Sequence, residues 1–454
     1  MKVLLINPFQ VDLVHQKGRI YNRTWTPLDL ANCGAVLEQA GIEVAILDAN
    51  AEQIGPEEVA RRAAGYDKVF ITSTSLDRWQ CPHLDINPFL KTVHAVTEVV
   101  LEVYVMGSHG TVKPVEMLKE TRARAIIRGE PERTVLELCQ DSPLSSTLGI
   151  TWHDGEKAVN NPDQKPVNLD ELPLPAFHLL PMDQYFYEVL GHNFTLFEMS
   201  RGCASRCTFC LLKTYGRGVR KKSVGKLLQE IDHAIKNFGV KHAYFMDLEF
   251  TVLRKQVIEL CEALIERKYD FTWCCQTRFD LVDEELLSLM KRAGCRLIHF
   301  GVEAGSDRIL SIVDKEITIQ EIEDGMRLVK AAGIESACFT IMGFPESTKE
   351  DMEDIIRFAK KLDPTYALFH VAAPYPGTRL YEQVLNDPNV RFSDNTLFPE
   401  AVIGRYTVEE LKAMTRKAYL QFYLRPSYIL SRLAKGEFRA LFNQLGLFWG
   451  FVKN

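Results

Sequence analysis

Hydrophobic and polar residues alternate in short runs over the first third of the chain. Four apolar, β-branched runs bounded by turn residues predict strands at 2–7, 43–49, 68–73 and 102–108. Between the first two, residues 28–41 have apolar positions at helical spacing and end at a glycine, which predicts a helix. Strands that alternate with helices imply an α/β fold with a parallel, doubly wound sheet.

A second alternating series occupies the later part of the chain. Apolar runs predict six strands, at 194–200, 242–247, 271–276, 297–301, 337–343 and 366–372. Helices are expected between them, beginning after Ser223, Thr318 and Thr348, and the Ser223 side chain can cap the first. Six strand–helix units imply a parallel barrel or partial barrel, whose chemistry belongs at the C-terminal strand ends.

These patterns divide the chain into four parts. We expect a doubly wound domain over 1–145 and a barrel domain over 191–390. Residues 146–190 have little periodicity and many prolines, so we expect a linker there. Residues 391–454 are helical in pattern and rich in aromatic side chains, which predicts a helical cap on the barrel.

The tail also allows a second interpretation, an interfacial membrane contact through Leu447, Phe448, Trp449 and Phe451. No apolar run approaches the roughly 18 residues that span a bilayer, and the N-terminal stretch shows no signal-peptide pattern. We therefore expect a cytoplasmic protein. The formal net charge of −6, without a strongly basic segment, argues against nucleic acid as the main partner.

The chain has 11 cysteines, an odd number that argues against a disulfide framework. Five of them lie in apolar patterns and are expected to pack as small buried hydrophobes, namely Cys33, Cys139, Cys261, Cys295 and Cys338. Three others, Cys203, Cys207 and Cys210, lie close together in the stretch SRGCASRCTFC, directly after the first strand of the second series. Structural zinc normally takes four protein ligands. Three cysteines would instead leave one iron of a 4Fe-4S (iron–sulfur) cluster open to bind a substrate.

The spacing C-x3-C-x2-C after a strand resembles the cluster motif of the radical S-adenosylmethionine (SAM) superfamily. The resemblance implies that the open iron chelates the amino and carboxylate groups of S-adenosyl-L-methionine. It further implies that the reduced cluster cleaves SAM to methionine and a 5′-deoxyadenosyl radical, with an external low-potential electron donor of the flavodoxin or ferredoxin type.

Residues at later strand ends resemble SAM-binding motifs of the same superfamily. Asp247 and Glu249 resemble the acidic motif that orients the SAM amino group, although many relatives have two adjacent acids there. Arg278 can pair a carboxylate bidentately, and Glu303 resembles the acceptor of the ribose hydroxyls. Gly343 lies in a loop that resembles those closing over adenine and substrate.

A flavodoxin/Rossmann-like domain before a partial (β/α)6 TIM-type radical SAM barrel resembles the subfamily that carries a cobalamin (B12)-binding domain. The matching fragments span residues 1–430. The resemblance implies cobalamin contacts from small residues at the strand ends of the first domain, namely Ser73, Ser75, Gly107, Ser108 and Gly110. Tight turns are the alternative explanation of these residues.

The third loop of the first domain, STSLDRWQCPHLD, is bulkier than in many relatives. With Asp77, Arg78, Trp79 and His83 it would either cover the lower cobalt face or fill the corrin pocket and leave a vestigial domain. No Asp-x-His-x-x-Gly motif is present, so a cobalt-coordinating histidine is not supported, and His83 and His109 are weak candidates.

Three functions are compatible with these features. The first is cobalamin-dependent C-methylation of a small-molecule natural product, sugar or lipid. The second is a cobalamin-independent radical reaction, either dehydration of a 1,2-diol of the aminoglycoside type or ring formation. There Tyr215 is the candidate hydrogen donor, and a packing aromatic is the alternative. The third is a non-catalytic Fe-S or cobalamin sensor, against which the SAM acceptors argue. The basic run 213–222 would attract an anionic substrate or be a solvated loop. The sequence does not define the oligomeric state.

Overall fold

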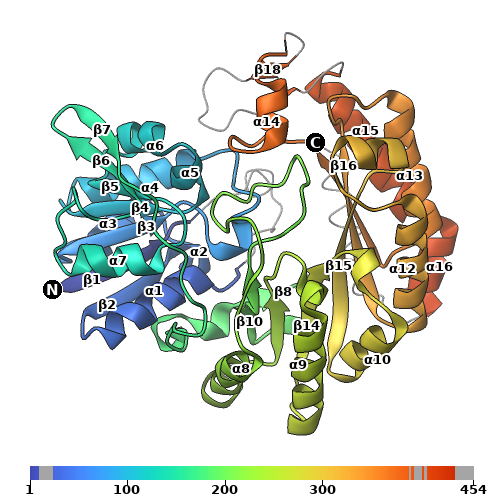
Figure 1. Ribbon diagram of the computed structural model, residues 1–454, viewed down its shortest axis with the longest axis horizontal. Coiled ribbons are helices and arrows are strands. Elements are labelled where there is room, and N and C mark those ends of the chain that lie inside the picture. The colour runs from blue at the N-terminus through green and yellow to red at the C-terminus, as the bar shows by residue number, and fades with distance from the viewer. Residues whose placement is uncertain (10–23, 388–389, 393–400, 403–405, 435–454) are drawn as a thin grey trace.

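The computed structural model describes residues 1–9, 24–387, 390–392, 401–402 and 406–434. Two sheets, each built mainly of parallel strands, lie side by side, one in the N-terminal part and one in the barrel (Figure 1). Each of the ten strands predicted from sequence forms within two or three residues of its expected bounds.

The first sheet has the strand order β2-β1-β3-β4-β5-β6-β7. Its parallel strands are β1 (Lys2–Asn7), β2 (Glu43–Asp48), β3 (Lys68–Thr72), β4 (Val103–Met106) and β5 (Ala125–Ile127). Buried side chains of α1 (Leu28–Gln39) and α7 (Glu132–Cys139) pack on one face. Those of α3 (Pro56–Ala63), α4 (Asn87–Thr97) and α6 (Pro114–Thr121) pack on the other. The doubly wound α/β architecture is therefore confirmed.

The segment expected to be a linker contributes to this sheet. Strands β6 (Ile150–Asp154) and β7 (Lys157–Asn160) form an antiparallel hairpin that extends the sheet beyond β5. The hairpin turns at Gly155, which has a φ of 60°. Two strands of four and five residues with polar outer ends are too short to show a clear hydrophobic period, which is why the linker interpretation missed them.

The second sheet has six parallel strands in chain order, as expected for a partial barrel. They are β10 (Phe194–Phe197), β13 (His242–Phe245), β14 (Thr272–Thr277), β15 (Cys295–Glu303), β16 (Glu335–Met342) and β17 (Tyr366–Val371). The helices α8 (Val224–Phe238), α9 (Arg254–Arg267), α10 (Glu284–Arg292), α12 (Ile319–Ala331) and α13 (Lys349–Leu362) lie outside them (Figure 1). The short helices are α2 (Ala49–Glu52), α5 (Ser108–Val112), α11 (Asp307–Ile312) and α14 (Arg379–Val384).

The three expected helix starts are capped by their own side chains. The Ser223 hydroxyl accepts from the Lys226 N–H at 3.3 Å. Thr318 and Thr348 form reciprocal capping boxes with Glu321 and Asp351. Such caps satisfy backbone donors that a helix start leaves unpaired, and therefore fix where the barrel helices begin.

The C-terminal region closes the open side of the barrel. Helix α15 (Val408–Tyr423) packs on β17, and α16 (Pro426–Ala434) follows it. The Tyr423 hydroxyl accepts from the Ala367 N–H and donates to the Ala367 carbonyl, both at 3.0 Å. The Tyr419 hydroxyl accepts from the Phe369 N–H at 3.2 Å. The helical cap is thus present in the described part of the tail.

The alternative membrane contact involves residues 447–451, which lie outside the described residues. Within the described ranges, no helix combines the length and apolar character needed to cross a bilayer. All five cysteines expected to pack as small hydrophobes are buried.

Candidate functional site

The three clustered cysteines occupy a loop that is closed at its base. Strands β11 (Ser200–Arg201) and β12 (Arg220–Lys221) pair antiparallel on either side of it. Gly202 has a φ of 89°, and a Cβ there would overlap the Gly218 carbonyl oxygen. The Gly218 N–H donates to the Cys203 carbonyl at 3.1 Å. The two ends of this loop, residues 203–219 and here called the cluster loop, are therefore packed against each other.

The sulfur atoms share a partly buried environment. Cys203 is buried, and Cys207 and Cys210 are partly exposed. Burial raises the pKa of the Cys203 thiol to about 11. Burial also raises the pKa of Cys210 well above its usual range, and the charges of Cys207 and Cys203 raise it further. Thiols that raise one another's pKa become thiolates together when a cationic iron–sulfur centre binds them, so the donor set fits such a group.

No three metal-binding side chains of the described residues lie close enough to share one metal ion. A cluster makes a different demand, because each thiolate binds a separate iron.

Glu249 lies beside the cluster loop. Its Oε1 accepts from the Ser205 hydroxyl at 2.6 Å, and its charge is among the causes that raise the pKa values of Cys203 and Cys207. Its carboxylate therefore lies against the cluster loop, and the contact with the SAM amino group expected of it stays a prediction.

Asp247 binds the segment that precedes the cluster loop. It is fully buried, with Oδ2 accepting from the Met199 N–H at 3.0 Å and Oδ1 accepting from the Ser200 hydroxyl at 2.5 Å. Burial raises its pKa to about 7. Both oxygens are thus occupied by the segment that joins β10 to β11.

Arg278 already has its bidentate carboxylate partner within the chain. Its Nε and Nη2 each donate to Asp280 at 2.9 Å. Nη1 donates to the Lys315 carbonyl at 2.7 Å, and Nη2 to the Glu316 carbonyl at 2.6 Å. The guanidinium therefore organises the 315–316 turn beside the cluster loop.

Glu303 pairs with a lysine that sequence reasoning did not single out. Lys315 Nζ lies 3.0 Å from Glu303 Oε1, and both side chains are buried. Glu303 has a φ of 61° at a register shift between β15 and β16. A side chain at Gly301 would overlap the carboxylate and lie 2.7 Å from Nζ, so the glycine makes room for this ion pair.

Lys315 is turned inward by its neighbours. Asp314 and Glu316 have φ values of 50° and 51°, so left-handed residues flank the lysine on both sides. Burial raises the pKa of Cys207, and the positive charge of Lys315 opposes that rise. A lysine in a short connection carries no motif, and only its tertiary contacts reveal it.

Close packing against α15 requires a glycine at position 343. Its φ is 78°, and a Cβ would lie 2.8 Å from Leu411 Cδ2 of α15. The SAM contact expected of this loop stays a prediction.

The small residues expected to contact cobalamin are mostly packed against other parts of the first domain. Gly107 has a φ of 101°, and its Cβ would lie 2.7 Å from the Ser73 hydroxyl oxygen. A Cβ at Gly110 would press on the Ile126 side chain. Ser73, Ser108 and Gly110 are buried, and Ser75 alone of the five small residues has a partly exposed side chain.

The third loop of the first domain reaches the cluster loop. The Ser108 hydroxyl donates to the Trp79 carbonyl at 2.8 Å and lies 3.3 Å from the Thr214 hydroxyl. The Trp79 ring is buried 5.2 Å from the Tyr215 ring. Its indole N–H has no hydrogen-bond partner among the described residues, an orphaned polar atom of the kind that a bound polar ligand satisfies.

The Tyr215 hydroxyl donates to the Leu76 carbonyl at 3.1 Å. The ring is buried, and burial raises the pKa of the hydroxyl well above its usual range. These contacts support the packing interpretation of Tyr215 that the sequence left open.

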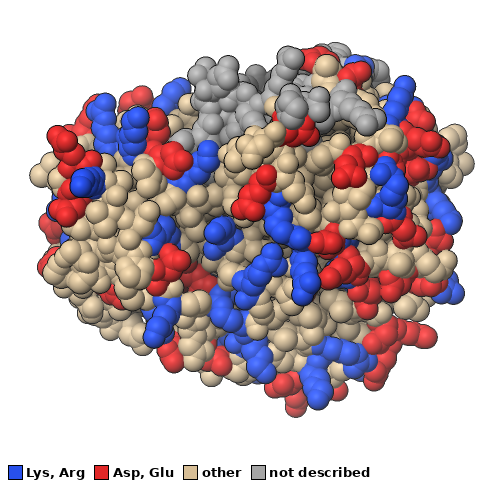
Figure 2. All heavy atoms as spheres, turned by 45° about the horizontal axis from the view of Figure 1, so that its top comes forward, with Lys and Arg blue, Asp and Glu red and all other residues tan. Residues whose placement is uncertain are grey.

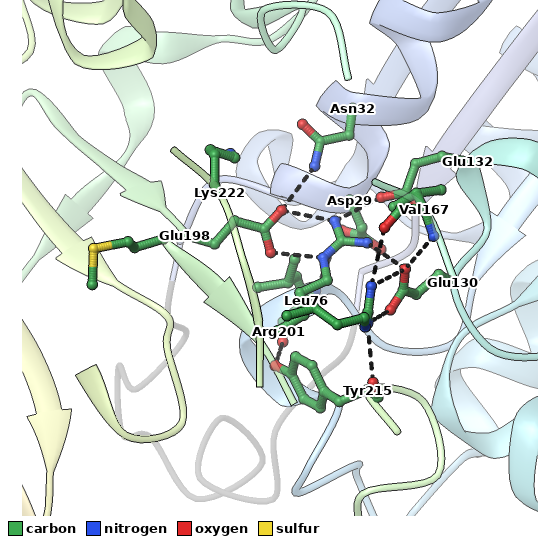
Figure 3. A network of polar contacts seen from close by, with 12 residues as sticks. Asp29, Asn32, Leu76, Glu130, Glu132, Val167, Glu198, Arg201, Tyr215 and Lys222 are labelled. Carbon is green, nitrogen blue, oxygen red and sulfur yellow. Dashed lines mark hydrogen bonds and ion pairs between the residues drawn. The ribbon is translucent and has the colours of Figure 1, made fainter. Parts of the chain in front are cut away.

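A buried ion network joins the two domains behind the cluster loop (Figure 3). Arg201 donates through Nε and Nη2 to Glu198, at 2.9 and 2.7 Å, and through Nη2 to Glu132 at 2.7 Å. Its guanidinium also lies 5.5 Å from the centre of the Trp79 ring. Burial raises the pKa of Glu132. Arg201, which directly precedes Gly202 and the cluster loop, therefore contacts both the barrel and the first domain.

The inner face of the barrel carries a second polar group. His299 is buried, with Nε2 3.1 Å from the Tyr187 hydroxyl and Nδ1 3.1 Å from the Tyr244 hydroxyl. Gln276 accepts from the Tyr244 hydroxyl at 3.5 Å. Partly exposed side chains on β14, β16 and β17 indicate where solvent reaches this face, namely Gln276, Phe339, Ile341 and Leu368. Sequence reasoning missed this group because the histidine lies within an apolar strand.

Fold and site together define an iron–sulfur enzyme of the radical SAM type, and comparison with known proteins agrees. A model of the radical SAM superfamily matches residues 197–359. A Pyrococcus horikoshii protein described as an uncharacterized methyltransferase is 32% identical over 442 residues, covering 95% of this chain and 94% of that protein. The anaerobic magnesium-protoporphyrin IX monomethyl ester cyclase of Rubrivivax gelatinosus is 27% identical, covering 99% and 86%.

Two solved structures share the whole architecture. The radical SAM methyltransferase TsrM of Kitasatospora setae, with cobalamin and a [4Fe-4S] cluster bound, has a TM-score of 0.73 at 16% identity, covering 94% of this chain and 89% of that one. OxsB, with aqua-cobalamin and SAM bound, has a TM-score of 0.74 at 16% identity, covering 98% and 72%. The chain belongs to the radical SAM superfamily and has the two-domain fold of its cobalamin-dependent members. It is an enzyme, with a 4Fe-4S cluster and SAM as its cofactors.

Proposed function

We propose that the protein is a cobalamin-dependent radical SAM methyltransferase that acts on an unactivated carbon of a small molecule. The observation that carries this proposal is the contact between strand-end loops of the first domain and the cluster loop, made by Leu76 of the third loop with Tyr215 and by Ser108, which follows β4, with Thr214. A methyl group held over the first sheet would lie beside the place where the substrate radical forms. The methyltransferase relatives and the architecture of TsrM and OxsB support it.

Cys203, Cys207 and Cys210 would hold the cluster, which supplies the electron that cleaves SAM. Glu249 accepts from the SAM amino group, since its carboxylate lies beside Ser205 between the first two cysteines. The Glu303–Lys315 pair would bind the ribose hydroxyls of SAM, since its buried position beside Cys207 fits a hydroxyl-bearing ligand.

When bound, cobalamin supplies the methyl group. The third loop would hold it through the buried Trp79 N–H and the partly exposed Ser75 and Arg78 side chains, a polar edge that suits the amide groups of a corrin. The packed residues Ser73, Gly107 and Ser108 support that edge from below.

The substrate would bind against the inner face of the barrel. Phe339 and His370 stack there with ring centres 5.8 Å apart, and Gln276 offers an amide on β14. Aromatic faces and a few neutral polar groups suit an uncharged, partly apolar small molecule.

A second candidate is a cobalamin-independent radical dehydration or ring formation. The close packing of Gly107 on Ser73, and of Ser108 on Trp79, favours it, because these contacts fill part of the expected cobalamin cradle.

An external low-potential donor would reduce the cluster. The cluster loop and the strand after it expose Arg206, Lys213, Arg217 and Lys221, and Figure 2 shows Lys and Arg side chains near the middle of one face of the molecule. Such a charge would favour an acidic electron carrier of the flavodoxin or ferredoxin type. A cytoplasmic location would provide the reducing conditions that this chemistry needs.

Anaerobic purification with cobalamin supplied, followed by a corrinoid absorption spectrum, tests the proposal. We expect close to one corrinoid per chain and the consumption of two SAM per methylated product. A corrinoid-free protein that still forms 5′-deoxyadenosine from SAM and dithionite would refute methyl transfer and support the second candidate.

A further inference from the structure

Two arginines face each other at the base of the cluster loop. Arg201 of β11 and Arg220 of β12 are directly paired across the short antiparallel ribbon. Like charges opposite each other destabilise a strand pair. The Arg201 side chain is fully buried and that of Arg220 is 29% exposed, so solvent does little to screen them. The ribbon therefore needs anions.

The barrel supplies one of these anions. Glu198, at the end of β10, takes two hydrogen bonds from Arg201. Arg220 has no carboxylate partner from the barrel among the described residues, and it also donates to the carbonyls of Val167 and Tyr215. With Glu198 alone, the ribbon would keep an uncompensated positive charge.

The first domain supplies two more, Glu132, which pairs with Arg201 at 2.7 Å, and Glu130, which contacts both arginines. Glu130, in the loop between β5 and α7, lies between the two guanidinium groups. Its Oε2 is 3.2 Å from Arg201 Nη1 (Figure 3). The same Oε2 accepts from Arg220 Nη1 at 3.2 Å, while Oε1 accepts from Arg220 Nη2. Oε2 also accepts from the Val167 N–H at 3.2 Å, which fixes the carboxylate in place.

The position of the ribbon determines the position of the first cysteine. Arg201 precedes Gly202, which packs on the Gly218 carbonyl, and Cys203 bridges to Arg217 on the opposite side of the loop. A shift of the ribbon would therefore move the first ligand of the cluster relative to Glu249, which follows β13, and Lys315, which lies in the turn before α12.

We propose that the first domain is a structural part of the cluster site, with Glu130 as a positioning residue that fixes the cluster loop by neutralising the Arg201–Arg220 pair. This role is separate from cobalamin binding and from methyl transfer. The barrel then presents its three cysteines correctly only when the charges of the Arg201–Arg220 pair are compensated, which Glu130 does in the wild type.

The test compares Glu130→Gln with the matched control Glu230→Gln in the full-length, anaerobically reconstituted protein. Glu230 of α8 forms a buried pair with Lys222, with Nζ 2.8 Å from both carboxylate oxygens. That pair flanks the same ribbon but lies wholly within the barrel. Both substitutions remove one buried carboxylate charge. Glu130→Gln leaves Arg220 without a carboxylate partner among the described residues, and Glu230→Gln leaves Lys222 without the carboxylate that it contacts.

We expect Glu130→Gln to shift the reduction potential of the cluster, to weaken the change that SAM causes in its EPR spectrum, and to slow 5′-deoxyadenosine formation by about tenfold. Glu230→Gln should lower the unfolding midpoint without altering the potential or the EPR signature. The charge-compensated variant Glu130→Gln/Arg220→Gln should recover most of the lost rate.

Unchanged cluster signatures in Glu130→Gln would overturn the proposal, and so would identical changes in both single variants. If Glu130→Gln does not fold, Glu130→Asp retains the charge on a shorter side chain and should show the same signatures in weaker form. The reduction potential, the EPR spectrum and 5′-deoxyadenosine formation report on the cluster and SAM only. Their outcome is therefore independent of the methyl-transfer proposal.

Discussion

Lys315 and Glu303 form a buried ion pair, 3.0 Å between Nζ and Oε1, in space that Gly301 leaves open. The pair joins the end of β15 to the turn before α12 and lies beside Cys207. It combines a strained backbone at Glu303 with a lysine turned inward by left-handed neighbours. Strain of this kind is retained at functional sites where the surrounding contacts over-determine it.

Lys315→Met should destabilise the protein strongly. Removing one partner leaves the Glu303 carboxylate buried and unpaired, at a cost of about 3–5 kcal/mol. Urea unfolding measures the loss, and SAM binding should weaken in parallel. The control is Lys361→Met, which removes an exposed ion pair with Glu323 and should cost less than about 1 kcal/mol. Equal losses in the two variants would contradict the buried pair.

Gly202→Ala should disrupt the cluster loop, because the added Cβ overlaps the backbone carbonyl of Gly218. We expect the variant to lose most of its iron and sulfide after reconstitution. Gly216 in the same loop also has a positive φ, 77°, but open space around its Cβ position. Gly216→Ala should therefore pay only the left-handed backbone cost of about 1–2 kcal/mol and keep its cluster. Iron and sulfide analysis of both variants is the measurement.

Tyr215→Phe separates packing from catalysis. The substitution removes only the hydrogen bond to Leu76, a loss of about 1 kcal/mol, and keeps the ring beside Trp79. We expect 5′-deoxyadenosine formation and product formation to stay within about twofold of the wild type. A variant that makes 5′-deoxyadenosine normally but no product would instead identify Tyr215 as a hydrogen donor.

Asp29 should make stability depend on pH. Burial raises its pKa to about 8 in the folded protein, from an ordinary value of 3.8. Between these values the unfolded chain releases the proton while the folded protein keeps it, so stability falls as pH rises from about 4 to 8.

Asp29→Asn retains the oxygen that accepts from the Leu76 N–H but does not titrate. Its stability relative to the wild type should therefore rise across that window, by up to about 1.4 kcal/mol per pH unit. Denaturant midpoints at several pH values check this, since Asp48 and Asp247 contribute alike in both proteins. A constant difference between the two proteins would contradict the buried, protonated Asp29.

The strands, the doubly wound sheet and the six-stranded partial barrel could be predicted because short apolar runs and capping residues such as Thr318 report local structure. The cysteine motif could be read for the same reason, since its three ligands lie in one short loop. The β6–β7 hairpin was missed, because its strands are too short to establish a period.

The partners of the site residues could not be predicted. Arg278 finds its carboxylate two residues away in Asp280, and Asp247 turns to the backbone behind the cluster loop. Lys315 carries no motif, and its role follows from contacts between two distant turns. Glu130 lies in the stretch RGEPERTVLEL, which matches the subfamily, but its partners become visible only where the two domains meet. Such assignments depend on long-range packing, which a single sequence does not reveal.

The tyrosines of α15 have a consequence for how the chain avoids other chains. A six-stranded open sheet exposes a row of unpaired backbone groups along β17, and such a row templates aggregation. Tyr419 and Tyr423 occupy the donors of Phe369 and Ala367 as a seventh strand would. Their phenol groups thus block the addition of a further strand at β17. The helix that carries them therefore prevents edge-to-edge association of the half-open barrel with other copies of the chain.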